Sequence, residues 1–123
     1  MCGISGFYNN SKLTFDYAIE KMNIAISHRG PDSKGVWQDK NSGIVLGHQR
    51  LSILDLSPAG IQPMQSSSGR YVLTYNGEIY NHLEIRKQLI KISSKLNWRG
   101  SSDTETLIEA IEIWGIEETL QKN

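Results

Sequence analysis

The apolar residues of this chain recur with two different periods, and the changes between them predict where helices and strands lie. Spacings of three and four residues are typical of helices that bury one face, whereas short apolar runs between turn residues are typical of strands. The strands are predicted next to one another rather than after every helix, which favours an α+β fold class. The helices are expected over about 15–27, 78–92 and 103–114, and the strands over 2–8, 36–37, 43–48 and 70–75.

Turn and capping residues separate these elements. Asn9-Asn10-Ser11 is a typical turn sequence. Asn76-Gly77 often closes a hairpin, but the helical spacing after it predicts a strand, a turn and then a helix. Ser102 and Glu105 have the spacing of a capping box at the start of a helix, and Gly115 is a suitable cap at its end.

The overall charge and the single cysteine exclude several classes of protein. Thirteen basic and thirteen acidic residues give a formal net charge of zero, so nothing favours a nucleic-acid partner. One cysteine cannot form an internal disulfide and fits a reducing compartment. No apolar run is long enough to span a membrane, and no signal peptide is indicated. We therefore expect a cytoplasmic protein without a membrane partner.

The only cysteine, Cys2, stands directly after the initiating methionine. Removal of Met1 would leave a thiol and a free α-amine on one residue, which is the arrangement that N-terminal nucleophiles use. A plain alternative is a buried and inert cysteine in a first strand. The three histidines do not have the spacing of metal ligands with Cys2, so no metal site is expected.

Several loops are richer in glycine and polar residues than loops require, at 28–32, 49–53, 75–81 and 100–105. Each has a plain explanation when it is taken alone. Arg50 could lie on the surface at a strand edge, and Asp103 could only complement the dipole of a helix. Single loops therefore leave the function open.

Taken together, these loops carry a resemblance to a known family. The chain resembles the N-terminal glutaminase domain of the asparagine synthetases, a class II glutamine amidotransferase domain with an N-terminal nucleophile. This resemblance implies one domain over 1–123 and an αββα sandwich of two mostly antiparallel sheets flanked by helices. The matching segments are MCGISGF (1–7), HRGPD (28–32), LGHQRLSILDL (46–56), GIQPM (60–64), YNGEIYN (75–81) and SDTE (102–105).

The resemblance also implies how the catalytic residues act. Cys2 would attack the side-chain amide of L-glutamine and form a γ-glutamyl thioester, which is then hydrolysed to glutamate. Asn76 and Gly77 would form the oxyanion hole, in which each donor is worth about 10²–10³ in rate. The α-carboxylate of glutamine would pair with Arg50.

The remaining substrate contacts are likewise implied by the family. Asp103 would bind the α-ammonium group of glutamine with help from Glu78. The backbone groups of Leu51 and Ile53 would line the same pocket. The glutaminase step is expected to need no cofactor and no metal.

The resemblance further implies a longer protein than these 123 residues. The family's glutaminase domain continues past this point, so the sandwich is expected to be incomplete at its C-terminus, and a synthetase domain that uses ATP and Mg is expected to follow. Ammonia would go to aspartate or a related carboxylate. The alternative is an inactive truncated fragment that keeps the glutamine pocket. An unpaired sheet edge would make the chain alone either a homo-oligomer or marginally stable.

Overall fold

The computed structural model describes residues 1–9, 16–53 and 56–122. Part of the turn predicted at 9–11, the start of the helix predicted from residue 15, and residues 54–55 of the LGHQRLSILDL segment lie outside this range. The chain forms two compact units, which are described separately. The first unit comprises Met1–Ser52, Ile61–Pro63 and Thr74–Asn76, and the second comprises Ile53–Gly60, Met64–Leu73 and Gly77–Asn123.

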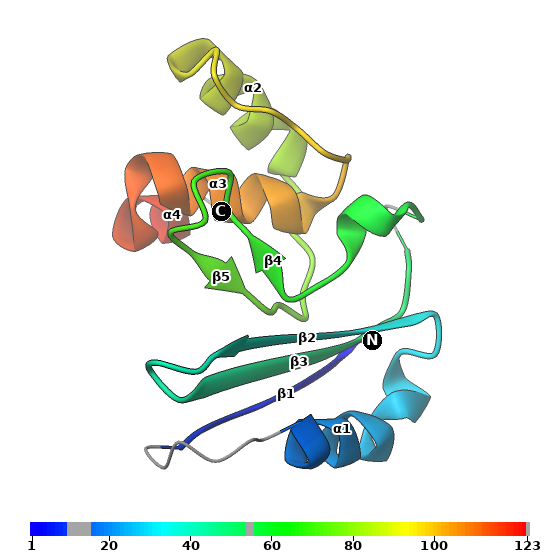
Figure 1. The fold of residues 1–123 in the computed structure, drawn as a ribbon. Helices are drawn as coiled ribbons and strands as arrows, with labels where there is room; N and C mark the ends of the chain where they lie inside the picture. The colour runs from blue at the N-terminus through cyan, green and yellow to red at the C-terminus, as the bar shows by residue number, and fades with distance from the viewer. Residues whose placement is uncertain (10–15, 54–55, 123) are drawn as a thin grey trace. The chain divides into compact units, whose positions relative to one another are not determined.

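The first unit contains an antiparallel sheet with β3 (Ile44–Arg50) at its centre. β1 (Gly3–Tyr8) and β2 (Ser33–Asp39) pair with β3 on either side (Figure 1). Helix α1 (Asp16–Ala25) packs against β1 and β3, and a short 3-10 helix, η1 (Ser27–Arg29), follows it. Side chains alternate along a strand, so every second residue of β1 and β3 faces α1. The residues between them face the opposite side of the sheet.

The interface between α1 and the sheet combines apolar packing with a buried polar cluster. Ile19 and Val45 are fully buried there. Asn23, one turn after Ile19, accepts a hydrogen bond from Ser5 at 2.6 Å, and its backbone carbonyl accepts one from Gln49 at 3.0 Å. The bond from Ser5 offsets part of the cost of burying the Asn23 side chain. Both bonds connect α1 to the strands.

The second unit consists mainly of helices around a short hairpin. β4 (Met64–Gln65) pairs antiparallel with β5 (Val72–Leu73), and a 3-10 helix, η2 (Pro58–Gly60), precedes them. Helix α3 (Asp103–Trp114) packs against α2 (His82–Ile92), α4 (Ile116–Lys122) and β4. The apolar core of this unit includes the buried side chains of Ile85, Leu89 and Ile108.

The predicted α+β class is confirmed, because the described residues contain helices together with two antiparallel sheets. The predicted C-terminal cap of α3 is also confirmed. Gly115 has a φ of 81°, in the region that favours glycine, and its N–H donates to the Ile111 carbonyl at 2.9 Å. The seven-residue helix α4 was not predicted by the spacing analysis.

Several predicted boundaries are wrong. Helix α2 begins at His82 rather than residue 78, because the N–H of Ile79 donates to the Asp103 carboxylate and residues before 82 form a turn. β2 begins at Ser33, because polar residues before Val36 pair with the end of β3. β5 is only Val72–Leu73, and the N–H of Tyr75 bonds a glutamine side chain instead of a strand.

Candidate active site

The Cys2 thiol lies half-buried at the start of β1, against the chain that leaves β3. The Leu51 N–H donates to Sγ at 3.3 Å, and Sγ lies 3.6 Å from the Leu51 carbonyl oxygen. This position follows from the strand register, because Gly3 pairs with Gln49 and Cys2 therefore continues alongside Arg50 and Leu51. The thiol contacts both backbone polar groups of Leu51. The thiol is thus held by polar groups rather than packed in an apolar core.

The HRGPD segment (28–32) also forms hydrogen bonds with the end of β3 and the residues that follow it. The Ser52 N–H donates to the Asp32 carboxylate at 2.7 Å, and the Asp32 N–H donates to the Arg50 carbonyl at 3.0 Å. Gly30 lies so close to β3 that a Cβ there would collide with the Gln49 backbone. The Arg29 guanidinium donates to the Cys2 carbonyl at 3.3 Å. This loop therefore positions both Cys2 and the residues that contact its sulfur.

The HRGPD segment had no predicted role, although it is rich in glycine and polar residues. Its function depends on which strand end it approaches. That information is absent from the local pattern, because the contacts join residues about twenty positions apart in the chain.

Arg50 is buried, with 8% of its surface exposed, so the alternative of a surface arginine at a strand edge is wrong. It lies two residues after His48 on β3 and so faces the same side of the sheet. Burial of a guanidinium is costly unless anions or other acceptors surround it. The planar guanidinium group can pair with an anionic group through two parallel hydrogen bonds.

Asn76 lies exposed directly after a segment whose backbone is held by two buried side chains. Gln62 accepts the Tyr75 N–H at 2.6 Å through its Oε1 atom. The ring Nε2 of His48 lies 3.3 Å from the Tyr75 carbonyl oxygen. Because a carbonyl only accepts, Nε2 carries the proton in this hydrogen bond.

The titration of His48 follows from this burial. Loss of solvation lowers the pKa of His48 below its ordinary value of 6.5. The hydrogen bond to Tyr75 opposes this effect, and the positive charge of Arg50 adds to it. The ring is consequently neutral near pH 7, in agreement with the hydrogen bond from Nε2.

In the second unit, Asp103 is the first residue of α3 and is buried. Its Oδ2 accepts the Ile79 N–H at 2.9 Å, and its Oδ1 accepts the Thr104 N–H at 2.8 Å. Asp103 therefore does more than complement the helix dipole, because it also anchors the turn that follows Glu78. Gly77 and Glu78 are exposed, and so is the side chain of Ile53.

The predicted capping box at the start of α3 is confirmed in one half. The Glu105 N–H donates to the Ser102 hydroxyl at 3.1 Å. The Glu105 carboxylate, which is 1% exposed, accepts instead from the N–H groups of Arg99 and Gly100 at 2.7 and 2.9 Å. It also pairs with Arg86 at 3.3 Å. Glu105 thus fixes the loop that leads into Asp103.

The predicted site residues fall into two groups. In the first unit, Cys2 and Leu51 are in direct contact, and Arg50 directly precedes Leu51. Asn76 also belongs to that unit. The second unit contains Ile53, Gly77, Glu78 and Asp103, and Asp103 there holds the turn after Glu78 through Ile79. Each role assigned to these residues remains a prediction.

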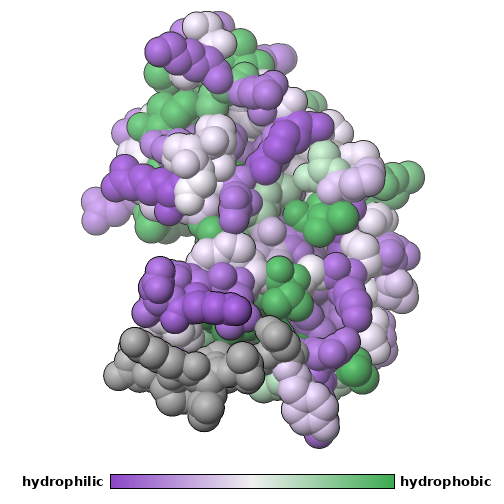
Figure 2. Space-filling model, in the orientation of Figure 1, coloured by the Kyte–Doolittle hydropathy of each residue, from purple (hydrophilic) through white to green (hydrophobic). Residues whose placement is uncertain are grey.

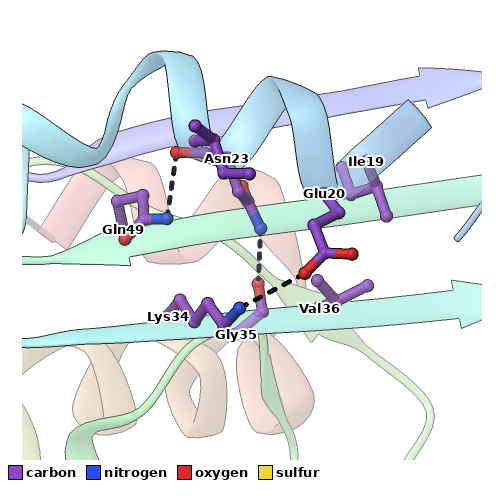
Figure 3. Close-up of a pocket in the computed structure, with 8 residues that line it drawn as sticks. Ile19, Glu20, Asn23, Lys34, Gly35, Val36 and Gln49 are labelled. Atoms are coloured by element: carbon purple, nitrogen blue, oxygen red, sulfur yellow. Dashed lines mark hydrogen bonds and ion pairs between the residues drawn. The ribbon is translucent and has the colours of Figure 1, made fainter. Parts of the chain in front are cut away.

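A separate cavity of about 310 Å³ lies between α1 and the edge of β2 (Figure 3). Asn23 and Gln49 bond one another in its wall, and Lys34 pairs with Glu20 at 3.5 Å. The predicted site residues do not line it, and the side chains of Cys2 and Arg50 belong to the other face of the sheet by strand alternation. The lining residues are Ile19, Glu20, Asn23, Ile24, Lys34, Gly35, Val36 and Gln49.

Within 1–9, 16–53 and 56–122, no three side chains of the His, Cys, Asp and Glu types gather where they could hold a metal ion. Among the helices of this part of the chain, none has the length and apolar character needed to cross a membrane.

The fold is of the α+β class, and the chain's cysteine lies beside its first strand in contact with the Leu51 backbone. The chain belongs to the family of glutamine amidotransferase domains, whose family model matches residues 1–123. The resemblance found in the sequence is thereby confirmed.

Three curated relatives show what the chain is similar to. It is 41% identical, over 88% of its length, to "Asparagine synthetase [glutamine-hydrolyzing] 1" of Bacillus subtilis and 33% identical, over 93%, to "Asparagine synthetase [glutamine-hydrolyzing] 3" of the same organism. It is 35% identical, over 94%, to "Amidase chry2" of Gibberella zeae. The chain spans 17%, 18% and 18% of the length of these relatives, respectively.

Proposed function

We propose that this protein hydrolyses L-glutamine to glutamate and ammonia, with Cys2 as the nucleophile. The observation that carries the proposal is the Cys2 thiol, held at 3.3 Å by the Leu51 N–H beside the buried Arg50. Membership of the glutamine amidotransferase family supports the substrate. No cofactor or metal is required for this reaction.

The proposed reaction begins after removal of Met1. The α-amine of Cys2 takes the thiol proton, and the sulfur attacks the amide carbon of glutamine. The negative charge that forms on the amide oxygen is stabilised by the Asn76 side-chain NH2 and the Gly77 N–H. The amine then gives the proton to the leaving nitrogen, and ammonia departs. The α-amine takes a proton from water as the water oxygen attacks the γ-glutamyl thioester. The carbon–sulfur bond breaks, the sulfur receives that proton from the amine, and glutamate is released.

Arg50 and Asp103 are proposed to bind the two charged ends of glutamine. The planar guanidinium of Arg50 would donate two parallel hydrogen bonds to the α-carboxylate of glutamine. Both oxygens of Asp103 already accept a backbone N–H. Each carboxylate oxygen has a further lone pair, so the α-ammonium group can still donate to it. Glu78 and the backbone of Leu51 and Ile53 complete the proposed contacts.

We also propose that the ammonia serves an ATP-dependent amidation by an asparagine synthetase-type domain. The support is that the two Bacillus subtilis relatives are asparagine synthetases by name and are each more than five times as long as the aligned region. ATP and Mg would act in that second reaction, on aspartate or a related carboxylate. The cytoplasm is the compartment proposed for both steps.

The first prediction concerns Cys2 and tests the nucleophile. Mass spectrometry of the purified protein should show Met1 removed and an electrophilic glutamine analogue attached to Cys2 alone. The Cys2→Ala variant should produce no glutamate from glutamine. As a matched control, one alanine inserted before Cys2 keeps the thiol but moves the α-amine, and it should lower turnover by about 10²-fold or more.

Two outcomes would contradict this proposal. Turnover retained by Cys2→Ala would exclude Cys2 as the nucleophile. A processed protein that binds glutamine but never forms a Cys2 adduct would support the alternative of an inactive domain with an intact pocket.

A further inference from the structure

Two buried side chains form hydrogen bonds with the Tyr75 backbone in the first unit. Gln62 accepts the Tyr75 N–H at 2.6 Å, and His48 donates to the Tyr75 carbonyl at 3.3 Å. Tyr75 is thus bonded through side chains at both of its peptide groups. The second of these groups is the peptide that joins Tyr75 to Asn76. Its plane sets the direction in which Asn76 leaves the backbone.

The burial of His48 leaves one of its ring nitrogens without a hydrogen bond among the described residues. Its side chain is completely buried, and its Nδ1 atom has no hydrogen-bond partner among the described residues. Buried polar atoms are nearly always satisfied, so an exception calls for an explanation. A leucine at this position of β3 would avoid the unsatisfied nitrogen but could not donate to Tyr75. The hydrogen bond to Tyr75 is therefore the feature that a histidine supplies here.

The position of Gln62 is also set by close packing. Its side chain is buried, and its backbone carbonyl lies so close to Gly35 that a Cβ at Gly35 would collide with it. The absence of a side chain on Gly35 lets the 61–63 segment lie directly on β2. The Oε1 atom that receives the Tyr75 N–H is consequently fixed relative to the sheet that carries Cys2.

We infer that His48 and Gln62 form a clamp on Tyr75 that positions Asn76 for its part in the oxyanion hole. This inference rests on the proposed glutaminase function. His48 and Gln62 are positioning residues, because they act on the reaction through the Tyr75–Asn76 peptide. Misplacement of a catalytic donor by about 1 Å can cost about 10²-fold in rate, so a rigid support has a large effect. The GHQR and GIQPM segments thereby gain a role that Cys2 and Arg50 alone do not explain.

The kinetic test is a double-mutant cycle with Asn76. His48→Leu and Gln62→Leu should each lower kcat for glutamine hydrolysis by about 10- to 100-fold and leave KM nearly unchanged, because Asn76 acts on the transition state. In the Asn76→Ala background, the same substitutions should change kcat by less than about 2-fold. His48→Gln places an amide donor near the Nε2 position. This variant should therefore keep most of the activity that His48→Leu loses.

A control separates positioning from general loss of stability. Ser5→Ala removes another buried hydrogen bond of the first unit, the one to Asn23. Ser5→Ala should lower kcat by the same small factor in the unmutated protein and in the Asn76→Ala variant. If His48→Leu and Gln62→Leu behave like Ser5→Ala, with equal losses in both backgrounds, the clamp is wrong.

A second readout does not depend on activity. Hydrogen exchange of the Tyr75 amide should be about 10-fold faster in Gln62→Leu than in the unmutated protein, whereas the amide of Val45 in β3 should change little. Unchanged exchange at Tyr75 would overturn the clamp even in an active enzyme. An unmutated protein without glutaminase activity would instead overturn the proposed function, and the Tyr75 exchange would still decide whether the clamp exists.

Discussion

At the scale of single residues, Arg50 shows how burial changes the meaning of a side chain. An arginine at the end of a strand has an ordinary surface explanation, but Arg50 is 8% exposed. Its position beside Leu51, which contacts the Cys2 sulfur, fits a role in substrate binding. The planar guanidinium can donate two parallel hydrogen bonds to a carboxylate, and an ammonium group cannot.

We predict that Arg50→Lys raises KM for glutamine by about 10- to 100-fold, because one charge-assisted hydrogen bond is lost. The kcat value should fall much less, since the carboxylate is remote from the reacting amide. Steady-state kinetics would measure both constants. Arg70→Lys is the matched control, because Arg70 is exposed and lies over the ring of Tyr71. Equal KM values for the two variants would argue against substrate binding by Arg50.

His48 predicts a pH dependence of stability. Its pKa in the folded protein lies below the ordinary value of 6.5, mainly because the ring is buried. As the pH falls below about 6.5, the unfolded chain binds a proton that the folded protein resists, so the free energy of unfolding decreases. This contribution is fully present above about pH 6.5 and is lost toward the lowered pKa, with a slope of up to about 1.4 kcal/mol per pH unit.

Denaturant titrations between about pH 8 and pH 5 would test this prediction. His48→Gln cannot be protonated and should show a shallower loss of stability in acid. His28→Gln should keep the slope of the unmutated protein, because His28 is exposed on η1. The same slope in all three proteins would contradict the assignment to His48.

At the scale of elements, the loop before α3 is held by a carboxylate that belongs to the helix itself. Glu105 bonds two backbone N–H groups of the loop and pairs with Arg86 and Arg99. The Arg86 guanidinium also stacks on the Trp98 ring at 3.9 Å. The start of α3, including Asp103, is therefore fixed by contacts to both the loop and helix α2.

We predict that Glu105→Ala lowers the free energy of unfolding by about 3 kcal/mol, because it leaves the largely buried Arg86 guanidinium without its carboxylate partner. Denaturant titration would measure the change. Glu118→Ala is the control, since the exposed Glu118–Lys122 pair on α4 at 3.6 Å should contribute less than about 1 kcal/mol. Similar losses for both variants would mean that the Glu105 network adds little.

At the scale of the whole molecule, the two units are not separate stretches of sequence. The chain leaves the first unit after Ser52 and returns to it for residues 61–63 and 74–76. The returning segments contain Gln62 and Tyr75, the residues joined by the shortest bond of the clamp. A cut of the chain at a single point would therefore not release either unit intact.

The first unit also carries exposed apolar residues on its strands. Ile4, Tyr8 and Val36 are 45%, 67% and 49% exposed, and β1 and β2 are the edges of the described sheet. On the face drawn in Figure 2, hydrophobic residues form separate groups among hydrophilic ones. Exposed strand edges and apolar side chains favour association between chains.

We predict that the purified 123-residue protein either forms homo-oligomers or unfolds at low denaturant concentration. Sedimentation velocity over a range of concentrations would show association, and a lysine at Tyr8 should reduce it because a charge on an edge strand opposes pairing. A compact monomer with a cooperative and stable unfolding transition would contradict this prediction.

Local features of the fold could be predicted from the sequence because they depend on residues close in the chain. The helical spacing around Ile19, the Ser102 cap and the Gly115 terminus all involve neighbours within about one turn. Boundaries set by distant residues were wrong. The start of α2 depends on Asp103, and the end of β5 depends on Gln62, neither of which lies in the predicted element.

The α+β class, the family and the candidate residues could be predicted from the amino-acid sequence, because each follows from local patterns and from motifs in a fixed order. Three further facts became visible only in the folded chain: Leu51 contacts the Cys2 sulfur, Arg50 is buried, and His48 and Gln62 bond the Tyr75 backbone. These facts depend on strand register and on contacts between residues far apart in the chain. Such contacts form only when the whole unit folds, so no local pattern contains them.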